Sequence, residues 1–201
     1  MKDKTKLSTK QLLKRNAILK AAIEEFSHKG YHKAKISTIA DLANVATGTV
    51  YLYFQSKENL LVSAFNGFTK TMLEDMKNKI ADENSTLERL IKLFDLHVGV
   101  FTKHPEVARF LAIELRQSPD FYENYPLHNP FLEYLTFIEK LIIDAIKEGS
   151  IREVDPKALT YIIFGTMDFL LTEWSTKDNP FPLQKAKDIV VDIIYNGIRK
   201  G

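Results

Sequence analysis

Two short helical patterns, separated by only a few residues, constrain this chain more than any other feature of its sequence. The first runs from about Ser37 to Ala43 and the second from about Thr47 to Phe54. Asn44 lies between them, and asparagine tolerates the left-handed backbone that a tight turn requires. Two short helices joined by a tight turn and docked on longer neighbours form a helix-turn-helix. The sequence predicts such a unit here.

Longer helical patterns surround this unit. In residues 11–26 the apolar side chains recur at helical spacing, and Gly30 supplies a stop. Ser56 caps a long helix over residues 57–80, which ends at a polar segment, 81–85. Further helical patterns cover residues 86–103, 105–117, 130–148, 156–177 and 183–199. Because no segment has convincing strand character, we predict an all-α fold of about nine helices.

One face of the second short helix suits a DNA groove. At about 100° per residue, Val50 and Phe54 lie together and should face the core of the unit. Gly48 and Leu52 then point outward. A glycine lets the helix backbone approach the base edges closely, and a leucine can contact a thymine methyl group.

Polar and aromatic side chains flank that outward face. Thr47 and Thr49 carry hydroxyls that can bond base edges or phosphates, and Tyr51 lies beside them. Tyr53 and Lys57 are placed for phosphate, Lys57 beside the amide-rich start of a helix. A tightly packed aromatic turn is the structural alternative, but it does not explain an exposed leucine and tyrosine on a basic helix.

The distribution of charge supports the same division. Residues 1–57 contain ten lysines, one arginine and four acidic residues, which gives +7, and the remainder carries −5. A basic segment joined to an acidic one indicates that only the first meets a polyanion. We expect a flexible basic arm over 1–10, a DNA-binding domain over 11–56, a connecting helix over 57–81 and a ligand-binding and dimerisation domain over 82–201.

The residues of the first domain resemble the TetR family signature. The resemblance lies in the segments IA at 39–40, ANVATGTVYLYF at 43–54 and KENL at 57–60, and in a first helix that carries Arg15, Ile18, Leu19, Ala22 and Phe26. It covers residues 11–61 and implies a three-helix DNA-binding domain, a C-terminal regulatory domain and a homodimer. It also implies contacts with double-stranded operator DNA by Ser37, Thr47, Thr49, Tyr51, Leu52, Tyr53 and Lys57.

Two departures from the family pattern concern helix starts. Ala46 stands where a serine commonly caps the recognition helix, and Lys35 stands where threonine is usual before the preceding helix. Loss of a cap costs about 1 kcal/mol. We expect the helices to form nonetheless, with Thr47 as a substitute cap.

The second half of the chain is rich in phenylalanine, with nine of the thirteen beyond residue 82. Aromatic residues at helical spacing usually belong to the core, but this number also fits an elongated apolar pocket. Candidate effector-binding residues here are Phe101, Phe137 and Phe164. Asp168 lies in an apolar helix and is costly there unless paired, so it bonds either the protein, which we favour, or a polar group of an effector.

Three segments are similar to one branch of the family, the fatty acyl-CoA-responsive, FadR-type repressors. They are YLYF at 51–54, ELRQS at 114–118 and IFGTMD at 163–168. The resemblance implies an effector with an apolar chain and a polyphosphate head. Arg109 and Arg116, seven residues apart, share a helix face that such a head can reach; pairing with nearby acids is the alternative and is favoured for Arg109.

The last two helical patterns suit a dimer interface. Gly165 and Thr166 permit close approach of helices, and an apolar stripe follows at Ile189, Val190, Ile193, Ile194 and Ile198. Packing within one subunit explains part of the stripe. A dimer is also what recognition of a two-fold symmetric operator requires.

Other classes of protein fit less well. The absence of cysteine excludes disulfides and thiol catalysis and fits a reducing cytoplasm. The first ten residues contain no apolar signal segment, and the most apolar stretch, 161–171, is too short to span a bilayer. The five histidines are scattered and no catalytic motif occurs, so we expect no enzyme, cofactor or metal. A helical adaptor leaves the basic, tyrosine-rich unit unexplained.

Together these patterns predict a cytoplasmic, ligand-responsive repressor. A small hydrophobic effector, under the FadR-type resemblance a long-chain fatty acyl-CoA, would release it from a palindromic operator. Control of an efflux or stress operon by a different hydrophobic compound is the alternative.

Overall fold

The computed structural model describes residues 8–109, 130–176 and 181–198, and these residues form helices without any strand. The all-α prediction is confirmed, with a number of helices close to the nine expected. None of the described helices is long and apolar enough to cross a membrane. By their contacts the residues divide into two compact units between Phe68 and Thr69, and each unit is described by itself.

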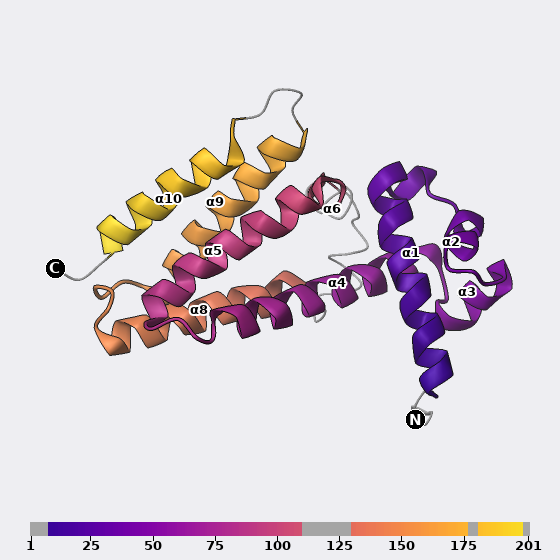
Figure 1. The fold of residues 1–201 in the computed structure, drawn as a ribbon, viewed down its shortest axis with the longest axis horizontal. Coiled ribbons are helices and arrows are strands. Elements are labelled where there is room, and N and C mark those ends of the chain that lie inside the picture. The colour runs from indigo at the N-terminus through magenta and orange to yellow at the C-terminus, as the bar shows by residue number, and fades with distance from the viewer. Residues whose placement is uncertain (1–7, 110–129, 177–180, 199–201) are drawn as a thin grey trace. The chain divides into compact units, whose positions relative to one another are not determined.

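The first unit begins with α1, Thr9–Lys33 (Figure 1). Ser8 caps this helix through a reciprocal pair of hydrogen bonds with Gln11, which starts it two residues earlier than the apolar pattern indicated. Gly30 interrupts it with a φ of 73°, a conformation that favours glycine. The predicted stop at Gly30 is therefore present, although one further helical turn follows it.

Two short helices follow, α2 (Ile36–Leu42) and α3 (Thr47–Tyr53). Asn44 lies between them with a φ of 52°, as predicted for the tight turn. The apolar core of the first unit draws on α1, α2, α3 and the start of α4. Its most deeply buried side chains include Ile18, Phe26, Ile39, Phe54 and Leu60.

The long helix α4, Lys57–Ile80, contributes residues to both units. The Ser56 hydroxyl accepts a hydrogen bond from the backbone N–H of Asn59, so the predicted cap is present. The division between the units falls inside this helix, between Phe68 and Thr69. The polar segment predicted at 81–85 ends α4, and Ser85 then caps the next helix in a capping box with Glu88.

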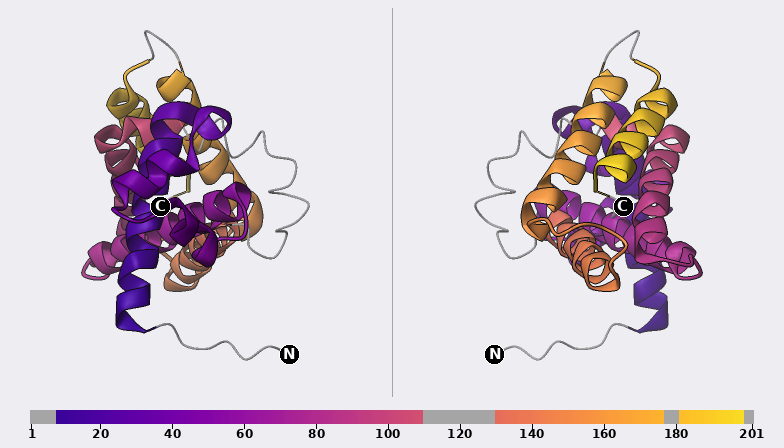
Figure 2. Two further views of the ribbon diagram at one scale, coloured as in Figure 1. Left: turned by 90° about the vertical axis from the view of Figure 1, so that its right-hand side faces the viewer. Right: turned by 90° about the vertical axis from the view of Figure 1, so that its left-hand side faces the viewer.

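The second unit is a helical bundle. It consists of α5 (Thr86–Lys103), α6 (Pro105–Arg109), α8 (Pro130–Glu148), α9 (Pro156–Thr176) and α10 (Leu183–Ile198), together with the end of α4. α5 packs against α8, α9 and α10, and α9 packs against α10 (Figures 1 and 2). Apolar side chains from all of these helices except α6 form one core, in which Ile138, Ile142 and Ala145 of α8 are fully buried. The helix predicted over 105–117 is described only as far as Arg109.

Two substitutions, one at a buried and one at an exposed residue, test how α3 packs on the first unit. Phe54 is 2% exposed, whereas Leu52, two residues earlier, is 85% exposed. Phe54→Ala should lower the free energy of unfolding of the first unit by about 3–5 kcal/mol, because it removes a large buried side chain and leaves a cavity. Leu52→Ala should change it by less than about 0.5 kcal/mol. Denaturant unfolding of both variants makes the comparison; equal losses would contradict the packing.

Candidate nucleic-acid interface and regulatory site

The outward face of α3 carries the side chains predicted to meet DNA. Leu52 is the most exposed of the large apolar residues recorded for the described chain, and Thr47, Gly48 and Tyr51 are also exposed. A Cβ atom added at Gly48 would meet nothing within 4 Å, so this face is open to an incoming surface. Of the other predicted residues, Ser37 is exposed on α2, and Thr49, Tyr53 and Lys57 are half-buried.

Two side chains anchor α3 from its inward face. Val50 is 1% exposed and Phe54, which follows the last residue of the helix, is nearly as buried. The guanidinium of Arg15 on α1 lies 5.4 Å from the ring centre of Phe54, a distance at which cation and ring attract one another. The prediction that Val50 and Phe54 face the core is confirmed, and the outward direction of Leu52 follows from it.

Neither short helix has a cap from its own N-cap side chain. Ala46 is the N-cap of α3, so the expectation that Thr47 would replace the missing cap is wrong. At α2 the buried carboxylate of Glu25 accepts a hydrogen bond of 3.2 Å from the backbone N–H of Lys35, which is the N-cap residue itself. This contact links α1 to the start of α2, and sequence reasoning missed it because no local spacing signals it.

Lys57 joins the start of α4 to the end of α1. Its Nζ donates a hydrogen bond of 3.3 Å to the backbone oxygen of His32 and lies 4.8 Å from the ring centre of Tyr31. Partial burial lowers the pKa of Lys57, and the carboxylate of Glu25 opposes that shift. An ammonium group has three N–H donors, so the bond to His32 is compatible with a further contact to phosphate.

In the second unit, two of the three predicted aromatic residues lie in one cluster. His97 of α5 lies 4.9 Å from Phe101 and 5.4 Å from Tyr134 of α8, between ring centres. Tyr134 in turn lies 6.1 Å from Phe164 of α9. Phe137 is partly buried against the same core, with the ammonium of Lys77 at 5.1 Å from its ring centre. The sequence pattern alone singles out neither His97 nor Tyr134 as a site residue.

Both polar members of this aromatic cluster are buried. His97 is 6% exposed and Tyr134 4% exposed, and neither the Nδ1 of His97 nor the hydroxyl of Tyr134 has a hydrogen-bond partner among the described residues. Burial lowers the pKa of His97 to about 3 and raises the pKa of Tyr134, so both are neutral at pH 7. A buried polar atom without a partner costs about 1–3 kcal/mol.

The structure gives fewer contacts for the other three residues predicted to bind an effector. Asp168 is half-buried in α9 and takes part in an interaction within the protein, in keeping with the structural alternative. Arg109 is the last described residue of α6, and the structure describes its backbone only. Arg116 lies outside the described residues altogether. Their predicted contact with a polyphosphate head stays a prediction.

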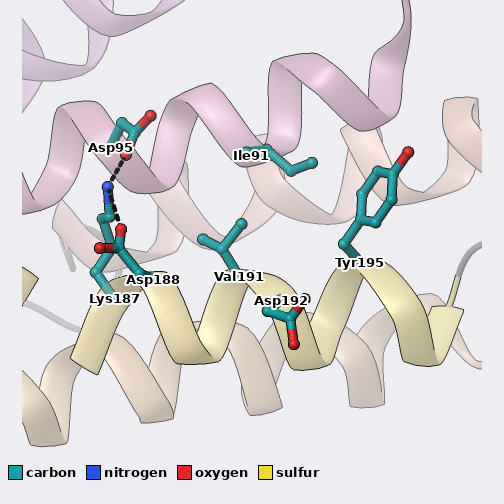
Figure 3. Close-up of a pocket in the computed structure, with 7 residues that line it drawn as sticks. All are labelled: Ile91, Asp95, Lys187, Asp188, Val191, Asp192 and Tyr195. Atoms are coloured by element: carbon teal, nitrogen blue, oxygen red, sulfur yellow. Dashed lines mark hydrogen bonds and ion pairs between the residues drawn. The ribbon is translucent and has the colours of Figure 1, made fainter. Parts of the chain in front are cut away.

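A groove of about 420 Å³ lies between α5 and α10 (Figure 3). Lys187 closes one end of it by pairing with Asp95 of α5 and, at 3.0 Å, with Asp188. Desolvation lowers the pKa of Lys187, but the hydrogen bonds to the two carboxylates outweigh it and leave the pKa raised. Because none of the predicted effector residues lines this groove, we assign the ion pairs to packing of α10 on α5.

An apolar surface remains on the last two helices. Ile162 and Phe169, seven residues apart on α9, are exposed, as are Ile189 and Ile193 on α10. Gly165 is exposed as well, and a Cβ there would meet nothing within 4 Å. The apolar stripe predicted on α10 divides, since Ile198 is buried in the core of its own unit. An exposed group of large apolar residues of this kind marks an interaction surface.

An open helix-turn-helix face on a basic unit, followed by a helical bundle with an aromatic core, defines a DNA-binding transcriptional regulator. The family described as bacterial regulatory proteins, tetR family, matches residues 18–64, and the family described as YsiA-like protein, C-terminal region, matches residues 65–197. The chain belongs to the TetR family of bacterial regulators. This match confirms the prediction of a regulator rather than an enzyme.

Relatives with known or named roles cover nearly the whole chain. The fatty acid metabolism regulator protein of Bacillus subtilis is 31% identical over 90% of this chain and 93% of its own length. The crystal structure of FadR from Bacillus subtilis in complex with stearoyl-CoA has a TM-score of 0.81 and 30% identity, over 92% of this chain and 99% of that one. The fatty acid degradation regulator FadR of Bacillus halodurans gives the same TM-score at 29% identity, with the same coverage. The chain is therefore similar to FadR-type regulators, as the sequence resemblance indicated.

Salt dependence can separate the residues predicted to contact the DNA backbone from those predicted to read the bases. Lys57→Ala should weaken binding to all DNA sequences alike and lower the slope of log affinity against log salt by about one, because it would remove the predicted phosphate contact. Tyr53→Phe should also weaken binding without regard to sequence. Thr49→Ala and Leu52→Ala should instead change the preferred sequence.

The control is Lys157→Ala, which removes an exposed lysine in the second unit. Thermal unfolding of each variant detects loss of the contact between Lys57 and His32, which would weaken DNA binding indirectly. If Lys57→Ala leaves both affinity and salt slope unchanged in a stably folded protein, the assignment of Lys57 to phosphate is wrong.

Proposed function

We propose that this chain is a homodimeric repressor, acting in the cytoplasm, whose operator binding is relieved by a long-chain fatty acyl-CoA. The observation that carries the proposal is the similarity, over nine-tenths of both chains, to a FadR structure that contains stearoyl-CoA. The aromatic cluster formed by His97, Phe101, Tyr134 and Phe164 supports it, since it provides an apolar interior within the bundle.

At the DNA, we propose that some of the predicted residues read base edges and that others contact phosphates. Leu52 and Thr49 would read base edges from the open face of α3, with Gly48 allowing close approach. Tyr53 and Lys57 would hold phosphates and fix the position of the helix. The exposed lysines of α1, among them Lys14, Lys20 and Lys29, add sequence-independent attraction for the duplex.

For the dimer, the exposed apolar residues of α9 and α10 are the proposed interface. Ile162, Gly165 and Phe169 share one face of α9 by their spacing, and Ile189 and Ile193 share one face of α10. Two copies of these faces would bury one another across a two-fold axis. A two-fold protein then matches the two half-sites of a palindromic operator.

If these faces form the dimer, a charged substitution within them should lower the mass measured by sedimentation. Sedimentation at micromolar concentration should give twice the chain mass of 23.1 kDa. Ile193→Glu should shift the protein toward monomer, because it places a charge inside an apolar interface. Leu132→Glu, a matched change at an exposed apolar residue of α8, should leave the dimer intact. A clean monomer that still binds a palindromic operator tightly would contradict the proposal.

The effector would act by linkage. A ligand shifts an equilibrium between two conformations only by its difference in affinity for them. In a dimer, the two helix-turn-helix units must be spaced to reach successive major grooves. If the acyl chain binds more tightly to a conformation in which that spacing is wrong, its binding weakens operator affinity. Typical couplings between two sites amount to about 1–3 kcal/mol.

Calorimetry and an operator gel shift with palmitoyl-CoA, free palmitate and CoA alone test the effector. Palmitoyl-CoA should bind and weaken operator affinity by about 5- to 150-fold, while CoA alone should not. Equal release by free palmitate would remove the role proposed for a head group. If none of the three binds, the effector is a different hydrophobic compound, and the family assignment is unaffected.

A further inference from the structure

His97 and Tyr134 are two polar side chains inside the aromatic cluster of the second unit. Both are more than nine-tenths buried, and they come from different helices, α5 and α8, with ring centres 5.4 Å apart. The Nδ1 of His97 and the hydroxyl of Tyr134 have no hydrogen-bond partner among residues 8–109, 130–176 and 181–198. Buried polar groups in proteins are nearly always hydrogen-bonded, so this pair calls for an explanation.

The surroundings of the pair are apolar and aromatic. Phe101 lies edge-on to His97, and Phe164 lies beside Tyr134. Because burial keeps the imidazole neutral at pH 7 and keeps the phenol protonated, neither group brings a charge. A neutral imidazole can carry its proton on Nδ1, and a phenol donates through its hydroxyl. The pair can therefore present two uncharged hydrogen-bond donors inside an apolar interior.

We propose that the His97 and Tyr134 side chains bind the carbonyl oxygen of the acyl group of the effector, with the Tyr134 hydroxyl and the His97 Nδ1–H as donors. The inference rests on the proposed function and adds the chemical group that is recognised. A carbonyl oxygen can accept two hydrogen bonds, so one such atom could accept from both side chains. The adjoining rings of Phe101 and Phe164 would contact the first carbons of the chain.

This arrangement selects between an acyl thioester and a free fatty acid. A thioester carbonyl is uncharged and pairs with neutral donors without further cost. A carboxylate placed against the same pair would be a buried charge facing two neutral donors, which is costly unless a cation pairs with it. The structure thus offers a source of specificity for the thioester that is separate from any contact with the CoA head.

The experiment uses the full chain and two ligands that differ only at the proposed contact: palmitoyl-CoA and S-hexadecyl-CoA, a thioether that lacks the carbonyl. The wild type should bind palmitoyl-CoA about tenfold more tightly in calorimetry, as expected for lost hydrogen bonds in a buried site. Tyr134→Phe should weaken palmitoyl-CoA by about tenfold and leave S-hexadecyl-CoA unchanged. His97→Phe should behave in the same way, and Tyr161→Phe, at an exposed tyrosine of α9, should change neither affinity.

Stability of the ligand-free protein provides the second readout. If the hydroxyl of Tyr134 serves the ligand rather than the fold, Tyr134→Phe should leave the unfolding temperature unchanged or raise it. A clearly lowered unfolding temperature would show that the hydroxyl has a partner within the chain and would overturn the proposal. Equal binding of the two ligands by the wild type would overturn it as well, while leaving the acyl-CoA repressor intact. A wild type that binds its operator but neither ligand would instead remove the effector assignment, and this inference with it.

Discussion

A helix of seven residues is too short to be stable in water by itself, so the DNA interface depends on what holds α3 in place. Val50 and Phe54 supply that anchor by burying one face of the helix, and Arg15 adds an attraction to the Phe54 ring. The opposite face is then exposed by geometry, since residues two apart on a helix point in nearly opposite directions. The exposure of Leu52 is thus a consequence of the burial of its neighbours.

Periodicity and turn chemistry are local, and the sequence predicted what they govern: the inward direction of Val50 and Phe54, the left-handed Asn44, and the cap at Ser56. Contacts between distant segments escaped prediction. Glu25 reaches the start of α2 across ten residues, and Tyr134 meets His97 only because α8 packs on α5. A histidine within the apolar pattern of 86–103 was the one available signal, and by itself it did not indicate a partner.

The two units share α4, and this gives the proposed regulation a physical route. Leu60 and Phe65 of α4 are buried, and farther along the helix Leu73, Met76 and Ile80 belong to the core of the second unit. Packed cores tend to rearrange between discrete states rather than deform smoothly. A ligand that alters the packing of α5, α8 and α9 would change what the second half of α4 packs against. Because α4 is one continuous helix with residues in both units, we propose that it transmits this change toward Lys57.

The proposed coupling between operator binding and acyl-CoA binding can be measured in both directions, because such coupling is reciprocal. Operator affinity should be measured with and without saturating palmitoyl-CoA, and palmitoyl-CoA affinity with and without saturating operator. Coupling through two conformations requires the same factor in both experiments, of the order of 5- to 150-fold. If both ligands bind and neither changes the affinity for the other, the chain is no acyl-CoA-responsive repressor.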